Sequence, residues 1–190
     1  MTNFALKYGT MRIPSQQLLS ELSQQVHQHK AAAVRWLQSD DKDLNFKRSA
    51  ESWSVLECIE HLNRYGNFYI PEIGKRLEKN TTHPGVFFKS GWLGNYFAKS
   101  MLPGEAMKPM KTFASMDPAG SSLDKQVLHA FIRQQDRLLE LLEQAATVNL
   151  KDTKTAISIT RLIRLRLGDT FRFVIYHNHR HIVQAQRLIP

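Results

Sequence analysis

Residues 53–62 read WSVLECIEHL, and this stretch decides the fold. Ser54 and Glu57 have the S-x-x-E spacing of a capping box, in which each side chain binds the other residue's backbone N–H where a helix begins. Trp53 and Cys58 occupy the two positions of a hydrophobic staple, which packs the residue before the cap against the first turn. The stretch therefore predicts that a long helix starts at residue 54.

Apolar residues at helical spacing extend this segment to Leu77, with a kink or local break expected at Pro71. The same periodicity predicts three further helices, which begin near Pro14, near residue 122 and at Asp169 and end near residues 37, 146 and 188. Pro14 suits a first helical turn, and Asp169 is a good N-cap. Four long helices are thus expected.

Residues 80–120 are rich in glycine, proline and aromatic residues. Disordered segments are poor in aromatic residues, so this stretch predicts an ordered connection, with a short helix over residues 92–99. Residues 149–168 partly alternate between apolar and polar, as an extended segment does. The chain of 190 residues is long enough for one domain with a proper core, and 42% of its residues are hydrophobic. We therefore expect residues 1–190 to form one all-α domain, a four-helix bundle with a long connection between its second and third helices.

Cytoplasmic residence is the expectation, on three grounds. Cys58 is the one cysteine, so no intramolecular disulfide can form. No stretch approaches the roughly 20 apolar residues of a membrane helix, and the N-terminus lacks the features of a signal peptide.

The formal net charge is +9, with arginines concentrated towards the C-terminus. Such a charge is typical either of a solvated cationic surface or of one that attracts an anionic partner.

His177 and His181 stand four residues apart in the last predicted helix. With about 3.6 residues per turn they share one face, where two imidazoles can hold one ion. His61, two turns into the second predicted helix, also lies on a largely apolar face and is the candidate third ligand. Three neutral histidines leave coordination positions open, which is typical of catalytic metal sites. The competing interpretation is that all three are hydrogen-bonded core residues.

Together these segments resemble the two signature regions of the DinB-like, or YfiT-like, superfamily. Its W-[ST]-x-x-E-x-x-x-H motif matches residues 53–61, and its H-x-x-x-H-x-x-Q motif matches residues 177–184. The resemblance implies a four-helix bundle of about this length, with a long connection between helices 2 and 3. It also implies that His61, His177 and His181 bind a divalent metal ion, with zinc or nickel expected.

The resemblance further implies packing roles beside the ligands for Trp53 and Gln184. Glu57 matches an acid of the motif, but the capping box explains it without any catalytic role. Among the activities implied are transfer of low-molecular-weight thiols such as bacillithiol or mycothiol, and thiol-dependent isomerisation. Hydrolysis by a metal-activated water is a further alternative. The connection over residues 80–120 is expected to reshape or cover the mouth of the site.

The remaining histidines and the cysteine fit structural roles. His29 and His129 are interpreted as core-edge or surface residues rather than a fourth ligand, His83 has no identifiable partner, and Cys58 is interpreted as a small apolar core residue. No phosphate-binding loop, serine-hydrolase elbow or nucleic-acid motif is present. The leading hypothesis is a metal-dependent enzyme acting on a small molecule. The alternative is a non-catalytic protein whose basic surface binds an anionic partner or nucleic acid, and a homodimer stays open in either case.

Overall fold

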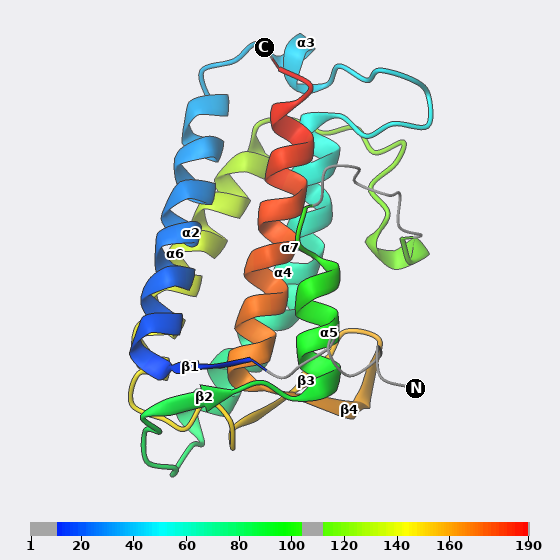
Figure 1. Cartoon of the computed structure of the whole chain (residues 1–190). Coiled ribbons are helices and arrows are strands. Elements are labelled where there is room, and N and C mark those ends of the chain that lie inside the picture. Colours follow the sequence, from blue (N-terminus) through cyan, green and yellow to red (C-terminus); the bar gives the residue numbers. More distant parts are fainter. Residues whose placement is uncertain (1–10, 104–111, 190) are drawn as a thin grey trace, which may run out of the picture.

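The computed structural model describes residues 11–103 and 112–189 of the chain. Four long helices among them lie side by side (Figure 1). They are α2 (Ser15–Trp36), α4 (Val55–Glu78), α6 (Gln126–Ala145) and α7 (Leu167–Gln186). Each of α4 and α2 packs against both α6 and α7, so the four close into a bundle, and the all-α fold predicted from the sequence is confirmed. In the described part of the chain, no helix has the length and apolar character needed to cross a membrane.

Contacts along the helices show their relative directions. Asn63 of α4 hydrogen-bonds the Val127 carbonyl at the start of α6, and Gly74 lies against Leu141 near its end. Helices α4 and α6 therefore run parallel. Consecutive parallel helices need a long crossover to return the chain to the starting end, and the segment between Glu78 and Gln126 supplies it.

Short elements occupy this crossover and both ends of the bundle. They are β1 (Arg12–Pro14), α3 (Asp41–Leu44), β2 (Phe87–Lys89), α5 (Trp92–Ser100), the 3₁₀ turn η1 (Ala114–Met116), β3 (Lys154–Ile157) and β4 (Thr160–Arg166). Antiparallel pairing joins β1 to β2 and β3 to β4, and both small sheets lie at one end of the bundle (Figure 1). The short helix and the extended segment expected near residues 92–99 and 149–168 are thus present. The part of the predicted connection that falls on residues 104–111 lies outside the described residues.

Some predicted boundaries were wrong by a few residues. Helix α6 begins four residues later than residue 122, whereas α2 begins at Ser15, directly after Pro14, as predicted. Helix α4 continues through Pro71, so no local break occurs there.

The start of α4 is built as its sequence predicts. The Glu57 backbone N–H donates to Ser54 Oγ at 3.1 Å, and the Ser54 N–H donates to Glu57 Oε2 at 2.8 Å. Glu57 also accepts from Lys47 Nζ at 3.1 Å and from the Gly120 N–H at 3.3 Å. The buried carboxylate therefore joins the helix start to both preceding and crossover segments, and needs no catalytic role.

The apolar core divides into two clusters, one around Leu22, Ile73 and Phe171 and the other around Ile59 and Phe131. Between the two clusters, each long helix carries buried polar side chains. These are His29 on α2, His61 and Asn63 on α4, Gln135 on α6, and His177, Asn178 and His181 on α7. The candidate histidines thus belong to a polar layer that crosses the bundle between two apolar halves.

Asp169 does not have the N-cap role predicted for it. Helix α7 begins two residues earlier, and the Asp169 carboxylate is fully buried. It pairs with Arg172 at 3.0 Å and accepts from the Gly91 N–H at 2.7 Å, while Arg172 also donates to Asn95 at 3.0 Å. This buried network fixes the start of α5 against α7. A Cβ on Gly94 would lie 2.5 Å from the Asp169 carboxylate, so only glycine permits this approach.

The capping box gives a direct stability test. Replacing Ser54 by Ala removes the acceptor for the Glu57 N–H, and the free energy of unfolding is expected to fall by about 1 kcal/mol. Urea unfolding followed by circular dichroism measures the change. Ser121→Ala, at an exposed serine without a capping role, is the matched control, and equal stability of the two variants would contradict the assignment.

Candidate metal centre

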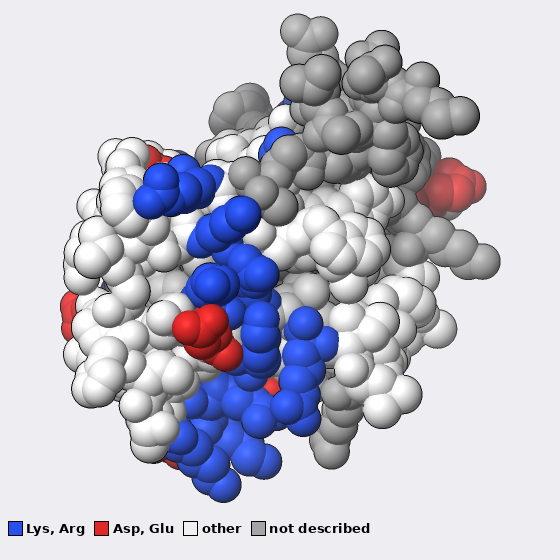
Figure 2. Space-filling model, turned by 60° about the horizontal axis from the view of Figure 1, so that its bottom comes forward, with Lys and Arg blue, Asp and Glu red and all other residues white. Residues whose placement is uncertain are grey.

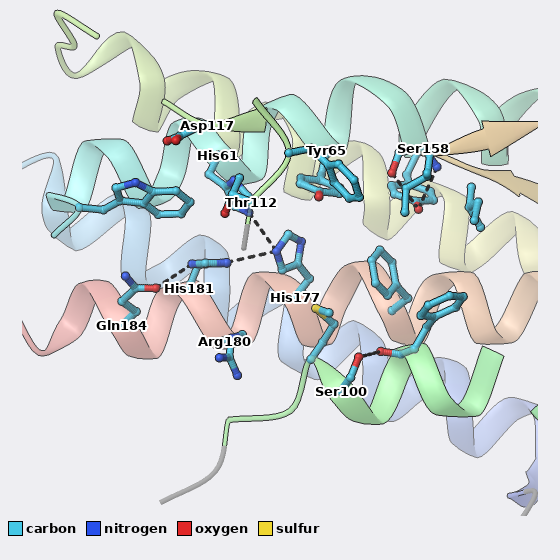
Figure 3. Close-up of a pocket in the computed structure, with 18 of the residues that line it drawn as sticks. His61, Tyr65, Ser100, Thr112, Asp117, Ser158, His177, Arg180, His181 and Gln184 are labelled. Atoms are coloured by element: carbon cyan, nitrogen blue, oxygen red, sulfur yellow. Dashed lines mark hydrogen bonds between the residues drawn. The ribbon is translucent and has the colours of Figure 1, made fainter. Parts of the chain in front are cut away.

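The three candidate histidines face one another across the groove between α4 and α7. Helices α4 and α7 run antiparallel, because His61 lies beside His177 while Tyr69, two turns further along α4, lies beside Phe173. Figure 3 shows His61 pointing down from α4 towards His177 and His181, which rise from α7 one turn apart. The structure therefore brings together the three residues that the sequence predicted.

The three rings converge through one kind of atom. His177 Nε2 lies 3.1 Å from His61 Nε2 and 3.1 Å from His181 Nε2. One ligand atom from each of the three histidines lies within 4.8 Å of the other two. All three side chains are buried, with at most 8% of any one exposed.

The outer nitrogens of two rings set their tautomers. His61 Nδ1 lies 2.8 Å from the carbonyl oxygen of Met116, which can only accept a hydrogen bond. His181 Nδ1 lies 2.9 Å from Gln184 Oε1. In each ring the proton therefore resides on Nδ1, and the Nε2 lone pair points towards His177.

This arrangement leaves a surplus of lone pairs at the centre. A proton on His177 Nε2 can be donated to His61 or to His181, but not to both at once. A cation shared by the three nitrogens would satisfy all of them. Tetrahedral zinc with nitrogen ligands at about 2.0–2.1 Å places those nitrogens roughly 3.3 Å apart, close to the 3.1 Å between His177 and each of the other two rings. The donor set thus fits a divalent ion.

Burial keeps the three imidazoles neutral. It lowers the pKa of His181 to about 3, and the neighbouring His61 adds to this shift. It also lowers the pKa of His177 well below the ordinary value, with His181 and His61 contributing. The pKa of His61 is lowered by burial as well, although its hydrogen bond to Met116 opposes the shift. Neutral imidazole is the form that binds metal.

Aromatic rings enclose the histidines. The Trp53 ring centroid lies 4.7 Å from that of His61 and 5.6 Å from that of His181. Tyr65 lies 5.0 Å from His61 and 4.7 Å from His177 by the same measure. Trp53 and Gln184 therefore contact the candidate ligands directly, as the family resemblance implies.

A cavity of about 770 Å³ opens onto the three histidines. Aromatic side chains form much of its wall, with arginines among the lining residues. The aromatic residues are Trp53, Tyr65, Tyr69, Tyr96, Phe97, Phe113 and Phe173, and the arginines are Arg48, Arg180 and Arg187. The crossover contributes α5 and the residues around η1, so it shapes the cavity as expected for residues 80–120. The β3–β4 hairpin adds Ile157, Ser158 and Leu165.

Several of these residues could not be found from the sequence. Met116 acts through its backbone carbonyl, which carries no side-chain signal, and it lies 55 positions from its partner His61. Tyr69 receives a hydrogen bond from the Ser158 N–H at 3.2 Å, a contact between α4 and the hairpin that spans 89 positions. Tyr65, by contrast, follows His61 by one helical turn, so helical spacing alone places it beside the site.

The other histidines lie elsewhere. His29 is buried on α2, where its ring stacks on that of His179 with the centroids 5.7 Å apart. His179, on α7, is half-buried beside it. His83 and His129 are exposed. Cys58 is buried, and burial raises the pKa of its thiol to about 12, so it remains a protonated core residue.

Comparison with known proteins identifies a family. A family model described as the DinB superfamily matches residues 25–185. The matched range contains all three candidate ligands, together with Trp53 and Gln184. No curated protein and no solved structure matches the chain.

His29 predicts a pH-dependent stability. Burial lowers its pKa from 6.5 to about 3, and neither ring nitrogen has a hydrogen-bond partner among the described residues. The unfolded chain therefore takes up a proton below pH 6.5 that the folded chain does not accept until about pH 3. Stability from this group is complete above the unfolded pKa, and falls by up to about 1.4 kcal/mol per pH unit between the two values.

Replacing His29 by Leu should flatten this dependence. Thermal unfolding of wild type and variant between pH 7 and pH 4 measures the difference, in which the shared contribution of the other histidines cancels. His27→Gln, at an exposed position of the same helix, should retain the wild-type slope. Identical slopes for wild type and His29→Leu would contradict the interpretation.

Proposed function

The chain belongs to the DinB superfamily, and from this premise we propose that it is a metal-dependent enzyme acting on a small molecule. His61, His177 and His181 would hold one divalent ion, with zinc or nickel as the expected metals. One observation carries the proposal: the three Nε2 atoms converge on one point in the wall of a cavity. A structural zinc site is closed by four protein ligands, whereas three ligands beside a cavity leave a position for substrate.

When bound, such an ion would act as a Lewis acid, which favours the thiolate form of a thiol ligand and lowers the pKa of a water ligand towards about 7. The chain's own residues prepare this chemistry. The Met116 carbonyl and Gln184 fix the tautomers of His61 and His181, so both rings offer Nε2 without rearrangement. Trp53 and Tyr65 pack against the rings and help to hold them in place.

The cavity favours a substrate of small-molecule size. Its volume of about 770 Å³ lies within the range of sites that bind drug-sized ligands. Aromatic side chains would pack against an apolar part of the substrate. Arg180, half-buried in the cavity wall between His177 and His181 in sequence, would attract an anionic group. The proposed reactions are transfer of a low-molecular-weight thiol and hydrolysis, with thiol transfer as the leading one.

Metal content tests the site. Wild-type protein purified without a His-tag and incubated with zinc or nickel should retain close to one equivalent by plasma mass spectrometry. His61→Ala, His177→Ala and His181→Ala should each retain far less, since a two-histidine site loses one of three bonds. His129→Ala, at an exposed histidine outside the cavity, should retain the wild-type amount.

Circular dichroism of each variant checks that loss of metal is not loss of fold. Metal retained by all three folded variants, or absent from wild type after incubation, would mean that the three histidines are core residues and not metal ligands.

Metal binding is expected to persist below pH 6, because the pKa of His181 is lowered to about 3 and protons therefore compete weakly for its nitrogen.

Cobalt substitution separates the two proposed reactions. Cobalt(II) in the triad gives visible absorption that responds to its ligands, and a small thiol such as 2-mercaptoethanol should add a thiolate-to-cobalt charge-transfer band. The band should be absent from His177→Ala treated identically. Cobalt loading without a thiol band, together with a pH-dependent spectrum that titrates near neutrality, would oppose thiol transfer and favour hydrolysis.

A further inference from the structure

The strand end of the molecule carries a band of positive charge. Figure 2, which brings this end forward, shows Lys and Arg side chains gathered in a band, with a few acidic side chains against it and mostly uncharged surface around it. The two small sheets supply several of them. These are Arg12 on β1, Lys89 on β2, Lys154 on β3, and Arg164 and Arg166 on β4.

Pairing within and between the sheets places these cations together. Arg12 stands opposite Lys89 in one sheet, and Lys154 stands opposite Arg166 in the other. The Arg166 side chain donates a hydrogen bond to the Lys89 carbonyl oxygen at 2.5 Å, which joins the two sheets. Each sheet therefore sets two cations side by side, and the positive field of the four side chains attracts an anionic partner.

Large apolar side chains are exposed at the same end. Leu162 on β4 is 94% exposed, and Trp92 at the start of α5 is 74% exposed. Arg164 and Arg166 share the outer face of β4, because side chains alternate along a strand, while Leu165 points inward, 3% exposed. Leu162 lies just before them, where the pairing of β4 with β3 is irregular. Trp92 follows Gly91, whose Cβ position would lie 3.5 Å from the Arg166 side chain. Exposed apolar side chains therefore accompany the cations at this end of the molecule.

The combination indicates the chemistry of the partner. The positive charge would attract the phosphates of nucleic acid, but an exposed aliphatic side chain on a hairpin adds little binding energy to such a complex. A second copy of the chain would bring the same positive band into contact with itself. The surface of an anionic bilayer satisfies both features: its headgroups attract Lys and Arg, and its interface accepts Trp and Leu.

We propose that the surface formed by Arg12, Lys89, Lys154, Arg164 and Arg166 with Trp92 and Leu162 binds anionic lipid bilayers peripherally. The apolar side chains enter the interface, and the cations lie at the level of the headgroups. This surface lies outside the metal centre: neither Trp92 nor Leu162 lines the cavity. The proposal therefore does not depend on the proposed enzyme activity.

Vesicle co-sedimentation tests the proposal on the full-length protein. The wild type should bind vesicles of phosphatidylcholine mixed with phosphatidylglycerol, bind pure phosphatidylcholine far less, and dissociate as salt rises. Leu162→Gln should lower the partition coefficient roughly tenfold, because it replaces an apolar side chain that enters the bilayer interface without changing the charge. Arg164→Gln should lower it about fivefold and reduce the salt dependence.

Matched controls lie at the opposite end of the bundle. Phe46 is 52% exposed and follows α3, and Arg35 is exposed in the last turn of α2. Phe46→Gln and Arg35→Gln should bind vesicles as the wild type does. All the substituted side chains are exposed at the surface, so each variant is expected to fold.

Three results would overturn the proposal. The first is no binding to anionic vesicles at low salt. The second is binding that Leu162→Gln leaves unchanged while duplex DNA competes for the protein, which would assign the surface to nucleic acid. The third is a dimer in sedimentation equilibrium that Leu162→Gln dissociates, which would assign the surface to a second copy of the chain.

Discussion

Three neutral imidazoles meet in the buried groove between α4 and α7, and their Nε2 atoms face a common point. Hydrogen bonds to Met116 and Gln184 turn the Nε2 lone pairs of His61 and His181 inward. A single proton on His177 cannot satisfy both neighbours at 3.1 Å. Such a constellation is costly in a core without a cation, since buried polar atoms need partners. The rest of the structure is arranged around these three nitrogens.

The fold meets the constraint by dividing its core. Each long helix carries buried polar residues at the level of the histidines, between two apolar clusters. Helices α4 and α6 run parallel, so the chain must return along the bundle before α6 begins. That crossover brings the Met116 carbonyl to His61 and aromatic side chains to the cavity. The long crossover between α4 and α6 therefore completes the site. The cations of the two small sheets lie on the surface at the strand end of the bundle.

Local signals explain what the sequence could predict. Ser54 and Glu57 predict the start of α4 because a capping box involves only four consecutive residues, and His177 and His181 share a face because helical geometry requires it. Contacts between distant segments had no such signal. Asp169 resembled an N-cap, but its carboxylate is buried against Gly91 and Arg172, and only the packing of α5 on α7 decides this. His179 faces His29 for the same reason. The apolar face of its helix made His61 the candidate third ligand, and the family resemblance supported its assignment beside His177 and His181.

X-ray absorption spectroscopy of the zinc-loaded protein tests the central claim most directly, since it reports the atoms bound to the ion. The account predicts three imidazole nitrogens at about 2.0–2.1 Å, with their characteristic multiple-scattering signal, and no sulfur. A sulfur atom at about 2.3 Å would place the ion on Cys58, the one cysteine of the chain. A shell of oxygen atoms without imidazole scattering would mean that the ion is bound elsewhere, and either result would contradict the three-histidine centre.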